Sequence, residues 1–352
     1  MKTIDKSKPV LVTGANGFVA SWLVKRLLEE GLTVHAAIRD PKNLNKTKHL
    51  TDIANQNKAT LVFFAADLLT RGSYKKAMEG CELVFHTASP FISRVNNVQK
   101  DLIDPAVIGT ENVLSSANET SSVKRVVITS SCAAMYTDAI DTVKAPEGRL
   151  NENSWNTTAS MTYQPYSLSK TLAEKKAWEI SSKQHNWDLI TINPCLVVGP
   201  SLNPENTTSE TFNILRTLGN GDMKMGAPKI GVGVVDVRDV ANAHYLAGYT
   251  PAAEGRYITA AHSTNFLEMG LVLRERFANK YPLPKNALPK WLVWLFGPML
   301  NKTLSRTFVC NNVNIPWKAD NSKIINHLGI RFRPLKETME DAFGQMDQEK
   351  MF

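Results

Sequence analysis

The sequence predicts an α/β protein whose doubly wound parallel sheet is followed by a smaller C-terminal lobe. Short apolar runs, typical of strands that are buried on both faces, alternate with helical patterns over residues 9–198. Parallel strands joined by helices in this rhythm form right-handed crossovers on both faces of one sheet. The rhythm stops after Gly199-Pro200, where short strands and proline-rich connections begin. We therefore expect one domain over residues 1–198 and, over 199–352, mainly a lobe, from which some segments (around 234–248) return to the first domain.

The first strand, turn and helix indicate a phosphate-binding site. Residues 10–12 form an apolar strand, and Gly14 and Gly17 lie in the turn before a helix that ends near Gly31. Gly14 allows the tight turn, while Gly17 leaves room for a pyrophosphate to approach N–H groups at the positive helix end. Ala20 takes the third small position. This is the Rossmann-type pattern for a dinucleotide, and a glycine turn in some other α/β protein is the alternative.

The end of the second strand distinguishes between the two nicotinamide dinucleotides. The strand covers residues 33–38, and Arg39 and Asp40 follow it. An acidic residue at this place binds a ribose 2′-hydroxyl, whereas an arginine binds a 2′-phosphate. Asp40 precedes Pro41 and so has the pattern of a helix N-cap. Because Asp40 is used as a cap, Arg39 is the residue that would bind a 2′-phosphate, and Lys46 would be a second cation beside it. We therefore expect NADP(H) as the cofactor.

The other strands of the first domain have the same apolar character. Asp67, after the third strand, suits an adenine amino group, and a helix cap is the alternative interpretation. His86, inside the fourth strand, is interpreted as a buried structural residue rather than a catalyst. We expect these strands at residues 60–64, 83–87, 125–130 and 189–193, and a helix at 105–117.

Tyr166 and Lys170 form the main catalytic pattern. Their spacing places a phenol and an ammonium one turn apart on the same face of a helix, which we expect over residues 163–182. An isolated tyrosine has a pKa near ~10, and a nearby lysine lowers it toward a value that suits a general acid for a carbonyl oxygen. Ser131, at the end of the fifth strand, would hydrogen-bond the same oxygen.

A second tyrosine and lysine, Tyr281 and Lys285, repeat the four-residue spacing. Two prolines between them forbid the helix that would align their side chains, so we do not expect a catalytic pair here.

The connections outside the main strands and helices have a mixed character. The connection 138–162 is polar, with a short helix expected at 153–155, and a lobe helix is expected at 264–279. We interpret the apolar segment 291–296, too short to span a bilayer, as lobe core or pocket wall, with docking to a partner or a membrane surface as the alternative.

Composition excludes several classes of protein. The chain has 352 residues, a formal net charge of +8 and four cysteines without a CxxC pair. Its Lys and Arg are mixed with 33 acidic residues, so we expect an anionic cofactor and no nucleic acid. Separated cysteines and histidines favour reduced thiols and no metal site. Without a signal-peptide pattern, we expect a cytoplasmic protein with no membrane insertion, as a monomer or homodimer.

Together these motifs resemble a known family, the extended short-chain dehydrogenases/reductases, and within it the dihydroflavonol-reductase-like branch. This branch includes plant dihydroflavonol and cinnamoyl-CoA reductases and NADPH-dependent aldehyde and ketone reductases. The resemblance covers the chain from Val10 almost to its end. It rests on TGANGFVASWL (13–23), IRDP (38–41), VFHTASP (84–90), ITSS (128–131), YSLSKTLAE (166–174), INPCLVVGP (192–200), DVRDVANAH (236–244) and FRPLKETMEDAF (332–343).

The resemblance implies a role for each matching position. Ser131, Tyr166 and Lys170 would be the catalytic triad. For the substrate, we expect Phe91, Met135 and Tyr136 to face the nicotinamide end of the cleft. Asp236, Arg238 and Asp239 match an ion-pair corner that closes the lobe. The cofactor would contact Gly14, Gly17, Phe18 and Val19 at the pyrophosphate, Arg39 and Lys46 at the 2′-phosphate, Asp67 and Leu68 at the adenine, Thr87 at a ribose, and Pro194 and Ser209 near the nicotinamide half.

Two departures from the family pattern direct the choice of substrate. Plant dihydroflavonol reductases carry Asn or Asp at the position of Tyr136, and the cinnamoyl-CoA reductase motif NWYCYGK is replaced by TYQPYSLSK at 162–170. We therefore expect an NADPH-dependent reductase of apolar or aromatic aldehydes and ketones. A hydroxysteroid dehydrogenase or a nucleotide-sugar epimerase of the same fold is the alternative. A non-catalytic NADPH-sensing protein is a third candidate, although the intact Tyr166 and Lys170 argue against it.

Overall fold

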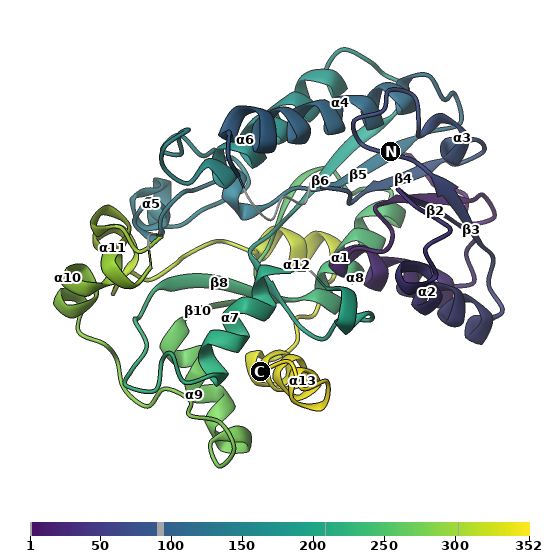
Figure 1. Ribbon diagram of the computed structural model, residues 1–352. Helices are drawn as coiled ribbons and strands as arrows, with labels where there is room; N and C mark the ends of the chain where they lie inside the picture. Colours follow the sequence, from purple (N-terminus) through teal and green to yellow (C-terminus); the bar gives the residue numbers. More distant parts are fainter. Residues whose placement is uncertain (1, 90–94, 208, 302) are drawn as a thin grey trace.

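A seven-stranded parallel sheet forms the centre of the protein (Figure 1). The structure is a computed structural model that describes residues 2–89, 95–207, 209–301 and 303–352. The strand order reverses at the first strand, which is the arrangement of a doubly wound Rossmann-type sheet, so the predicted fold class is confirmed. Across the sheet the strands are β3 (Leu61–Ala65), β2 (Val34–Ile38), β1 (Val10–Thr13), β4 (Leu83–His86), β5 (Arg125–Thr129), β6 (Asp188–Pro194) and β9 (Gly255–Thr259).

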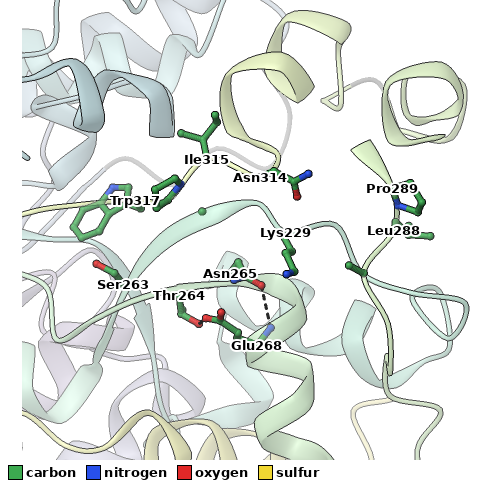
Figure 2. A pocket seen from close by; sticks show the side chains of 13 residues that line it. Lys229, Ser263, Thr264, Asn265, Glu268, Leu288, Pro289, Asn314, Ile315 and Trp317 are labelled. Atoms are coloured by element: carbon green, nitrogen blue, oxygen red, sulfur yellow. Dashed lines mark hydrogen bonds between the residues drawn. The ribbon is translucent and has the colours of Figure 1, made fainter. Parts of the chain in front are cut away.

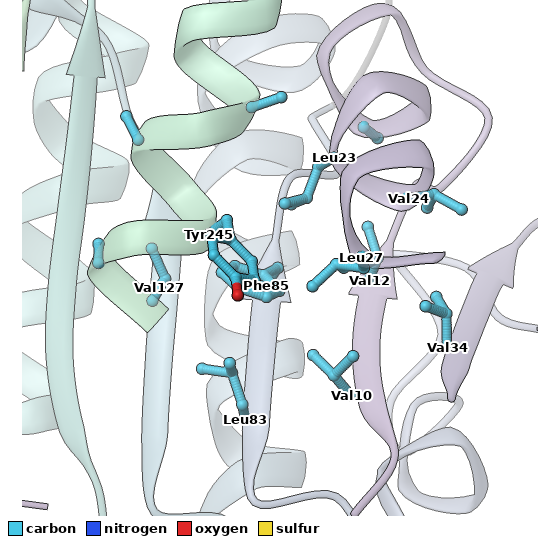
Figure 3. Packing of buried hydrophobic residues seen from close by; sticks show 14 of the residues in the cluster. Val10, Val12, Leu23, Val24, Leu27, Val34, Leu83, Phe85, Val127 and Tyr245 are labelled. Carbon is cyan, nitrogen blue, oxygen red and sulfur yellow. The ribbon is translucent and has the colours of Figure 1, made fainter. Parts of the chain in front are cut away.

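Helices cover both faces of this sheet. Successive side chains of a strand point to opposite faces, so Val10 and Val12 enter one apolar layer and Leu11 enters the other. Figure 3 shows the first layer, in which Leu23 and Tyr245 pack over the central strands. The first face carries α1 (Phe18–Glu29), α2 (Leu44–Asn57), α8 (Val237–Tyr249) and α12 (Ser322–Leu328). The second carries α3 (Lys75–Met78), α4 (Asp104–Asn118), which continues the π-helical turn η1 (Gln99–Ile103), and α6 (Pro165–Ser181).

The C-terminal lobe is built on a second, three-stranded sheet. Its central strand β8 (Gly231–Asp236) pairs antiparallel with β10 (His262–Asn265) and parallel with β7 (Leu196–Val198). The chain leaves the lobe to add α8, β9 and α12 to the main domain; α8 lies in the expected range around 234–248, and β9 and α12 lie beyond it. The remaining helices are α7 (Glu210–Gly219), α9 (Phe266–Phe277), α10 (Lys290–Leu300), α11 (Arg306–Asn312) and α13 (Leu335–Gln348).

Two predictions of local structure are wrong. Residues 153–155 form no helix; the connection instead begins with α5 (Ala139–Lys144), whose N-terminus has a capping box formed by Asp138 and Asp141. Asp40 accepts a hydrogen bond from the Lys42 N–H in a turn (3.1 Å), and α2 begins only after this turn. The predicted lobe helix is confirmed as α9, and it begins at Phe266 because residues 262–265 pair with β8. Short 3₁₀ turns occur at η2 (Cys132–Ala134), η3 (Pro146–Gly148) and η4 (Pro204–Asn206).

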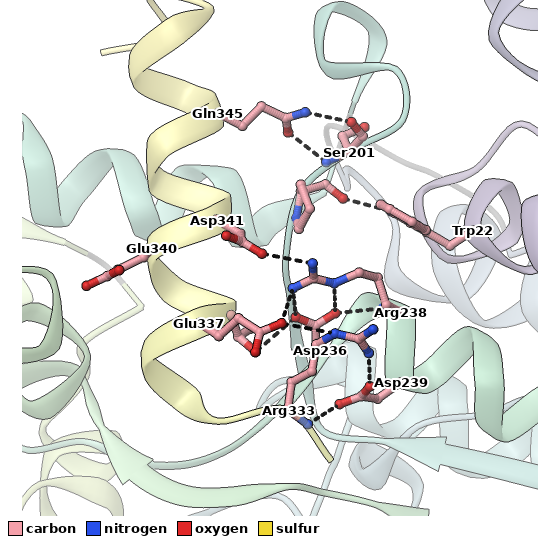
Figure 4. Close-up of polar contacts among 12 residues, drawn as sticks. Trp22, Ser201, Asp236, Arg238, Asp239, Arg333, Glu337, Glu340, Asp341 and Gln345 are labelled. Atoms are coloured by element: carbon pink, nitrogen blue, oxygen red, sulfur yellow. Dashed lines mark hydrogen bonds and ion pairs between the residues drawn. The ribbon is translucent and has the colours of Figure 1, made fainter. Parts of the chain in front are cut away.

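The predicted ion-pair corner is present between α8 and α13 (Figure 4). Arg238 donates to both carboxylate oxygens of Asp236 (Nε–Oδ1 2.9 Å, Nη2–Oδ2 2.7 Å) and to Asp341 of α13 (2.8 Å). The backbone N–H of Arg333 donates to Asp239 (2.7 Å), and the two side chains form an ion pair. These contacts attach the last helix to the start of α8, which is a structural role.

Candidate active site

The turn between β1 and α1 presents an open helix N-terminus. Gly14 has a φ of +61°, and a Cβ on it would lie 2.9 Å from the Cα of Ala88, so this turn requires glycine to pack against the segment after β4. Gly17 is the N-cap of α1, and in the described chain no side chain caps this end. A Cβ on Gly17 would lie 3.2 Å from the Gly14 carbonyl oxygen. The first N–H groups of α1 therefore suit a phosphate, and these residues fit the pyrophosphate of a dinucleotide.

The start of α1 lies against the lobe. Phe18 packs edge-on against Phe212 of α7, with 5.7 Å between ring centroids, and Val19 beside it is half-buried. Ser209 is the N-cap of α7, one turn before Phe212. Pro194 is buried at the carboxyl end of β6. Among the residues expected at the pyrophosphate and the nicotinamide half, Phe18 and the start of α7 are therefore in contact.

The residues expected at the adenosine end follow β2 and β3. Arg39 directly follows β2 and is exposed, as is Lys46 on α2. Asp67 accepts a hydrogen bond from the Leu69 N–H (2.8 Å) and so stabilises its own turn. The next helix is α3, which begins at Lys75, so Asp67 is not a helix cap. Leu68 packs against Gly109 of α4, where a Cβ would approach it to 3.2 Å.

A buried polar group lies where β1 and β4 end. The hydroxyl of Thr13 is 3.0 Å from Nδ1 of His86 and accepts from the Ala88 N–H (3.1 Å). Thr87 donates its hydroxyl proton to the Thr13 carbonyl. Burial lowers the pKa of His86 to about 3, and the charge of Lys170 adds to this shift. His86 is therefore neutral and structural, which confirms the interpretation from sequence.

Tyr166 and Lys170 are aligned on one face of α6. Gln164 adopts the left-handed region (φ 53°) and turns the chain into this helix, so that Tyr166 lies in the first turn with 51% of its surface exposed. The ammonium of Lys170 lies 5.7 Å from the centroid of the Tyr166 ring and donates to Oγ of Ser89 (3.1 Å). Ser89 follows β4, so Lys170 connects the helix with the carboxyl end of the sheet.

Ser131 lies at the end of β5 in a turn that packs on the same helix. It is the N-cap of η2, and its Oγ accepts from the Ala133 N–H (3.1 Å). η2 contacts α6. The structure thus brings Tyr166 and Lys170 together and places the turn of Ser131 against their helix.

A buried ion pair fixes this helix to the sheet. Glu174, one turn after Lys170, accepts from Nε of Arg256 (2.6 Å), from Nδ2 of Asn193 (2.7 Å) and from the Ser130 hydroxyl. Glu174 and Arg256 are 3% and 6% exposed. Asn193 also donates to the carbonyl of Ser131 (3.2 Å). The network therefore joins α6 to the carboxyl ends of β5 and β6 and to the start of β9.

Sequence reasoning assigned no role to Ser89, Glu174, Asn193 or Arg256. The four-residue spacing from Lys170 to Glu174 could have indicated that both lie on one face of α6. The other partners come from different strands, and their proximity has no local signal in the sequence.

The three residues that were expected to contact the substrate differ in how far they are buried. Phe91 lies outside the described residues. Met135 is 3% exposed and belongs to an apolar cluster with Cys132 and Trp317, so, contrary to expectation, it does not line an open surface. Tyr136 is half-buried and packs edge-on against Trp317, with 5.9 Å between ring centroids. Burial raises the pKa of Tyr136.

A pocket of about 610 Å³ lies in the lobe (Figure 2). Trp317 lines it and also contacts Tyr136, whereas Ser131, Tyr166 and Lys170 are not among its lining residues. Its wall is mixed in character. It includes Lys229, Ser263, Thr264, Asn265, Glu268, Leu288, Pro289, Asn314 and Ile315.

The sheet order and the open glycine turn define the class of this protein: a Rossmann-type enzyme that uses a dinucleotide. The model of the NAD dependent epimerase/dehydratase family matches residues 10–259. The chain belongs to this family, the extended short-chain dehydrogenases/reductases, and it is an NAD(P)-dependent reductase. The predicted family, with its dihydroflavonol-reductase-like branch, is confirmed.

Three relatives illustrate the similarity. A cinnamoyl-CoA reductase (CAD2) of Medicago truncatula is 41% identical over 353 residues, 99% of each chain. A bifunctional dihydroflavonol 4-reductase/flavanone 4-reductase of Pyrus communis is 36% identical over 80% of this chain and 79% of its own. Among solved structures, yeast methylglyoxal/isovaleraldehyde reductase Gre2 complexed with NADPH has a TM-score of 0.79 at 28% identity, and the match covers 98% of this chain and 100% of that chain.

Proposed function

We propose that this protein reduces the carbonyl group of apolar or aromatic aldehydes and ketones to alcohols, with NADPH as reductant and Tyr166 as proton donor. The observation that carries the proposal is the alignment of Tyr166 and Lys170 on α6, with the turn of Ser131 packed on the same helix. The names of two relatives agree in reaction type, because cinnamoyl-CoA, methylglyoxal and isovaleraldehyde all contain a carbonyl group.

In this proposal the three side chains act on one carbonyl oxygen. NADPH, when bound, supplies the hydride for the carbonyl carbon. The Tyr166 hydroxyl gives its proton to the carbonyl oxygen, and the Ser131 hydroxyl donates a hydrogen bond to the same atom. Lys170, 5.7 Å from the ring centroid, stabilises the phenolate that remains on Tyr166. Because Tyr166 is half exposed, water can restore its proton.

The cofactor is assigned to residues around the carboxyl edge of the sheet. The N–H groups at the start of α1 would bind the pyrophosphate, with Gly14 and Gly17 giving it access. The exposed Arg39 and Lys46 would bind the 2′-phosphate. The remaining assignments follow the family motif and are Phe18, Val19, Asp67, Leu68, Thr87, Pro194 and Ser209.

Replacing Arg39 tests the cofactor assignment. A charge-assisted contact with a 2′-phosphate contributes about 1.5–3 kcal/mol, so NADPH should bind roughly ten to a few hundred times more tightly than NADH. Arg39→Ala should remove most of this difference, as measured by fluorescence titration with both cofactors. Arg331→Ala, at an exposed arginine between α12 and α13, is the matched control and should preserve it. Equal affinity of the unmutated protein for NADH and NADPH would refute the assignment.

The substrate class is supported by the sequence around Ser131. Tyr136 follows the turn of Ser131 and is half-buried, with its ring packed against the buried Trp317. Burying an aromatic substrate ring against an apolar wall contributes about 1.5–3 kcal/mol. The two departures from the plant motifs, at Tyr136 and at 162–170, favour simple aldehydes and ketones over flavanonols and coenzyme A thioesters.

NADPH consumption by the purified protein tests the proposal. The panel contains benzaldehyde, cinnamaldehyde, an aliphatic keto-ester, a flavanonol, cinnamoyl-CoA, a ketosteroid and a UDP-sugar. We expect the highest kcat/KM for the aromatic aldehydes or the keto-ester. A clear preference for the ketosteroid or the UDP-sugar would assign the protein to the alternative activities, and a preference for cinnamoyl-CoA would contradict the argument from its missing motif.

A further inference from the structure

α10 is apolar around its whole circumference, yet the protein buries only one side of it. Val293 and Gly297 face the body of the lobe, where Val293 packs with Ile230 and Val309. A helix that is apolar all round is normally buried. The prediction that the segment 291–296 is lobe core or pocket wall is therefore wrong for most of its side chains. Figure 1 shows α10 at the edge of the molecule beside α11.

Six large apolar side chains of α10 are exposed together. The least buried are Met299 and Leu300, at 82% and 85% exposed. Single exposed apolar residues are ordinary, whereas such a group on one helix indicates a surface that another apolar phase covers. We call these residues the α10 surface. They are Trp291, Trp294, Leu295, Phe296, Met299 and Leu300.

The segment that contains this surface is strongly basic. Residues 276–319 include seven Lys and Arg and no Asp or Glu, although the whole chain has a net charge of only +8. Two of these cations, Arg276 and Lys280, form ion pairs with Glu340 and Asp347 of α13, so the cations that bear on α10 are those on and directly after it. Arg306 lies over the Trp294 ring, 4.5 Å from its centroid, and Lys290 begins the helix with its ammonium on the Cys310 carbonyl (2.9 Å).

We propose that the α10 surface inserts into the headgroup region of an anionic lipid membrane. Tryptophan, phenylalanine and leucine beside Lys and Arg are the composition of helices that lie in the plane of a membrane interface. None of the described helices is long and apolar enough to cross a bilayer, so the helix lies on the surface. The apolar side chains enter the headgroup boundary, while Lys290 at the start of α10 and Arg306 over Trp294 are attracted to acidic lipids.

A second copy of the chain suits this surface less well. A two-fold interface brings the same patch of both subunits together, and each patch would contribute the same cations without an acidic residue from residues 276–319. Like charges facing each other oppose such a contact. An anionic membrane would bury the apolar side chains and also neutralise the neighbouring cations.

Vesicle flotation with the full-length protein tests this inference. We expect binding to phosphatidylcholine vesicles that contain phosphatidylserine, weaker binding without phosphatidylserine, and loss of binding at high salt. Trp291→Ser combined with Leu295→Ser should weaken binding more than tenfold. Arg306→Gln should weaken it about fivefold. The matched controls are Ile108→Ser with Ile325→Ser, exposed on α4 and α12, and Arg331→Gln, and they should bind like the unmutated protein.

Tryptophan emission measures insertion into the vesicles, and sedimentation measures whether the protein forms a dimer. Insertion should shift the emission to shorter wavelength on addition of the anionic vesicles, and the shift should disappear in the Trp291→Ser and Leu295→Ser variant. The NADPH-dependent activity of this variant toward a water-soluble substrate should be unchanged, because neither residue belongs to the catalytic or cofactor site. Equal binding by the α10 variant and its control would overturn the inference. A dimer that only the α10 variant abolishes, without vesicle binding, would assign the surface to a second copy and also overturn it.

Discussion

Tyr166 and Tyr281 each precede a lysine by four residues, yet the two pairs have different structures. Tyr166 and Lys170 share a helix face, and the ammonium lies 5.7 Å from the ring centroid. Tyr281 lies in an irregular segment between α9 and α10, where the cation near its ring is Lys280 (5.5 Å) and not Lys285. The spacing therefore produces a pair only where the backbone between the residues is helical.

The surroundings of the two phenols differ as much as their backbones. Tyr281 donates its hydroxyl proton to Asp347 (2.6 Å), and its ring packs with Phe343 and Phe352. Burial and the hydrogen bond to this carboxylate raise the pKa of Tyr281. A general acid works best when its pKa lies near the operating pH, and this shift moves the pKa of Tyr281 away from neutral pH. Tyr281 therefore serves to close the lobe core at the end of the chain.

Tyr166→Phe is the change with the largest expected effect on this comparison. It removes the proton donor and keeps the ring, so kcat should fall by about two to four orders of magnitude. NADPH affinity should remain almost unchanged, because the hydroxyl acts on the substrate carbonyl in our proposal. Steady-state kinetics and cofactor titration measure the two effects. Near-normal turnover of this variant would contradict the role proposed for Tyr166.

Glu174→Gln tests what holds the helix of Tyr166 in place. The substitution keeps the shape of the side chain but leaves Arg256, which is 6% exposed, without a charged partner. Breaking one side of a buried ion pair costs about 3–5 kcal/mol, so the midpoint of urea unfolding should fall clearly. Glu179→Gln, on the exposed side of the same helix, should leave the midpoint unchanged. Equal midpoints for both variants would show that the buried pair does not stabilise α6.

The two tyrosines also show what could be predicted from the sequence. Local patterns were sufficient for the glycine turn, for the alignment of Tyr166 with Lys170, and for the exclusion of Tyr281. They were insufficient for the network around Glu174, because Arg256 lies 82 residues away along the chain. They also failed for α5, a six-residue helix whose first N–H is bound by Asn312 of α11. Tertiary contacts of this kind leave no periodic signal.

Met135 and α10 show the same limit at the level of surfaces. Both are apolar; Met135 was expected to face the substrate cleft, and the segment 291–296 was expected to be lobe core or pocket wall. The turn η2 directs Met135 into a buried cluster, whereas α10 turns most of its side chains outward. Hydrophobicity alone does not determine which side of an element is covered. That depends on the residues that pack against the element. Trp317 packs in the same cluster as Met135, whereas the lobe covers only one face of α10.

Tyr281→Phe is the smallest expected change and completes the comparison. The aromatic packing with Phe343 and Phe352 is kept, and only the hydrogen bond to Asp347 is lost. Asp347 still has Lys280 as a partner, so the carboxylate is not left without a contact. We expect the melting temperature to fall by no more than about 2 °C and the turnover to stay within the error of the unmutated protein. If Tyr281→Phe reduced turnover as strongly as Tyr166→Phe, the distinction between the two pairs would be wrong.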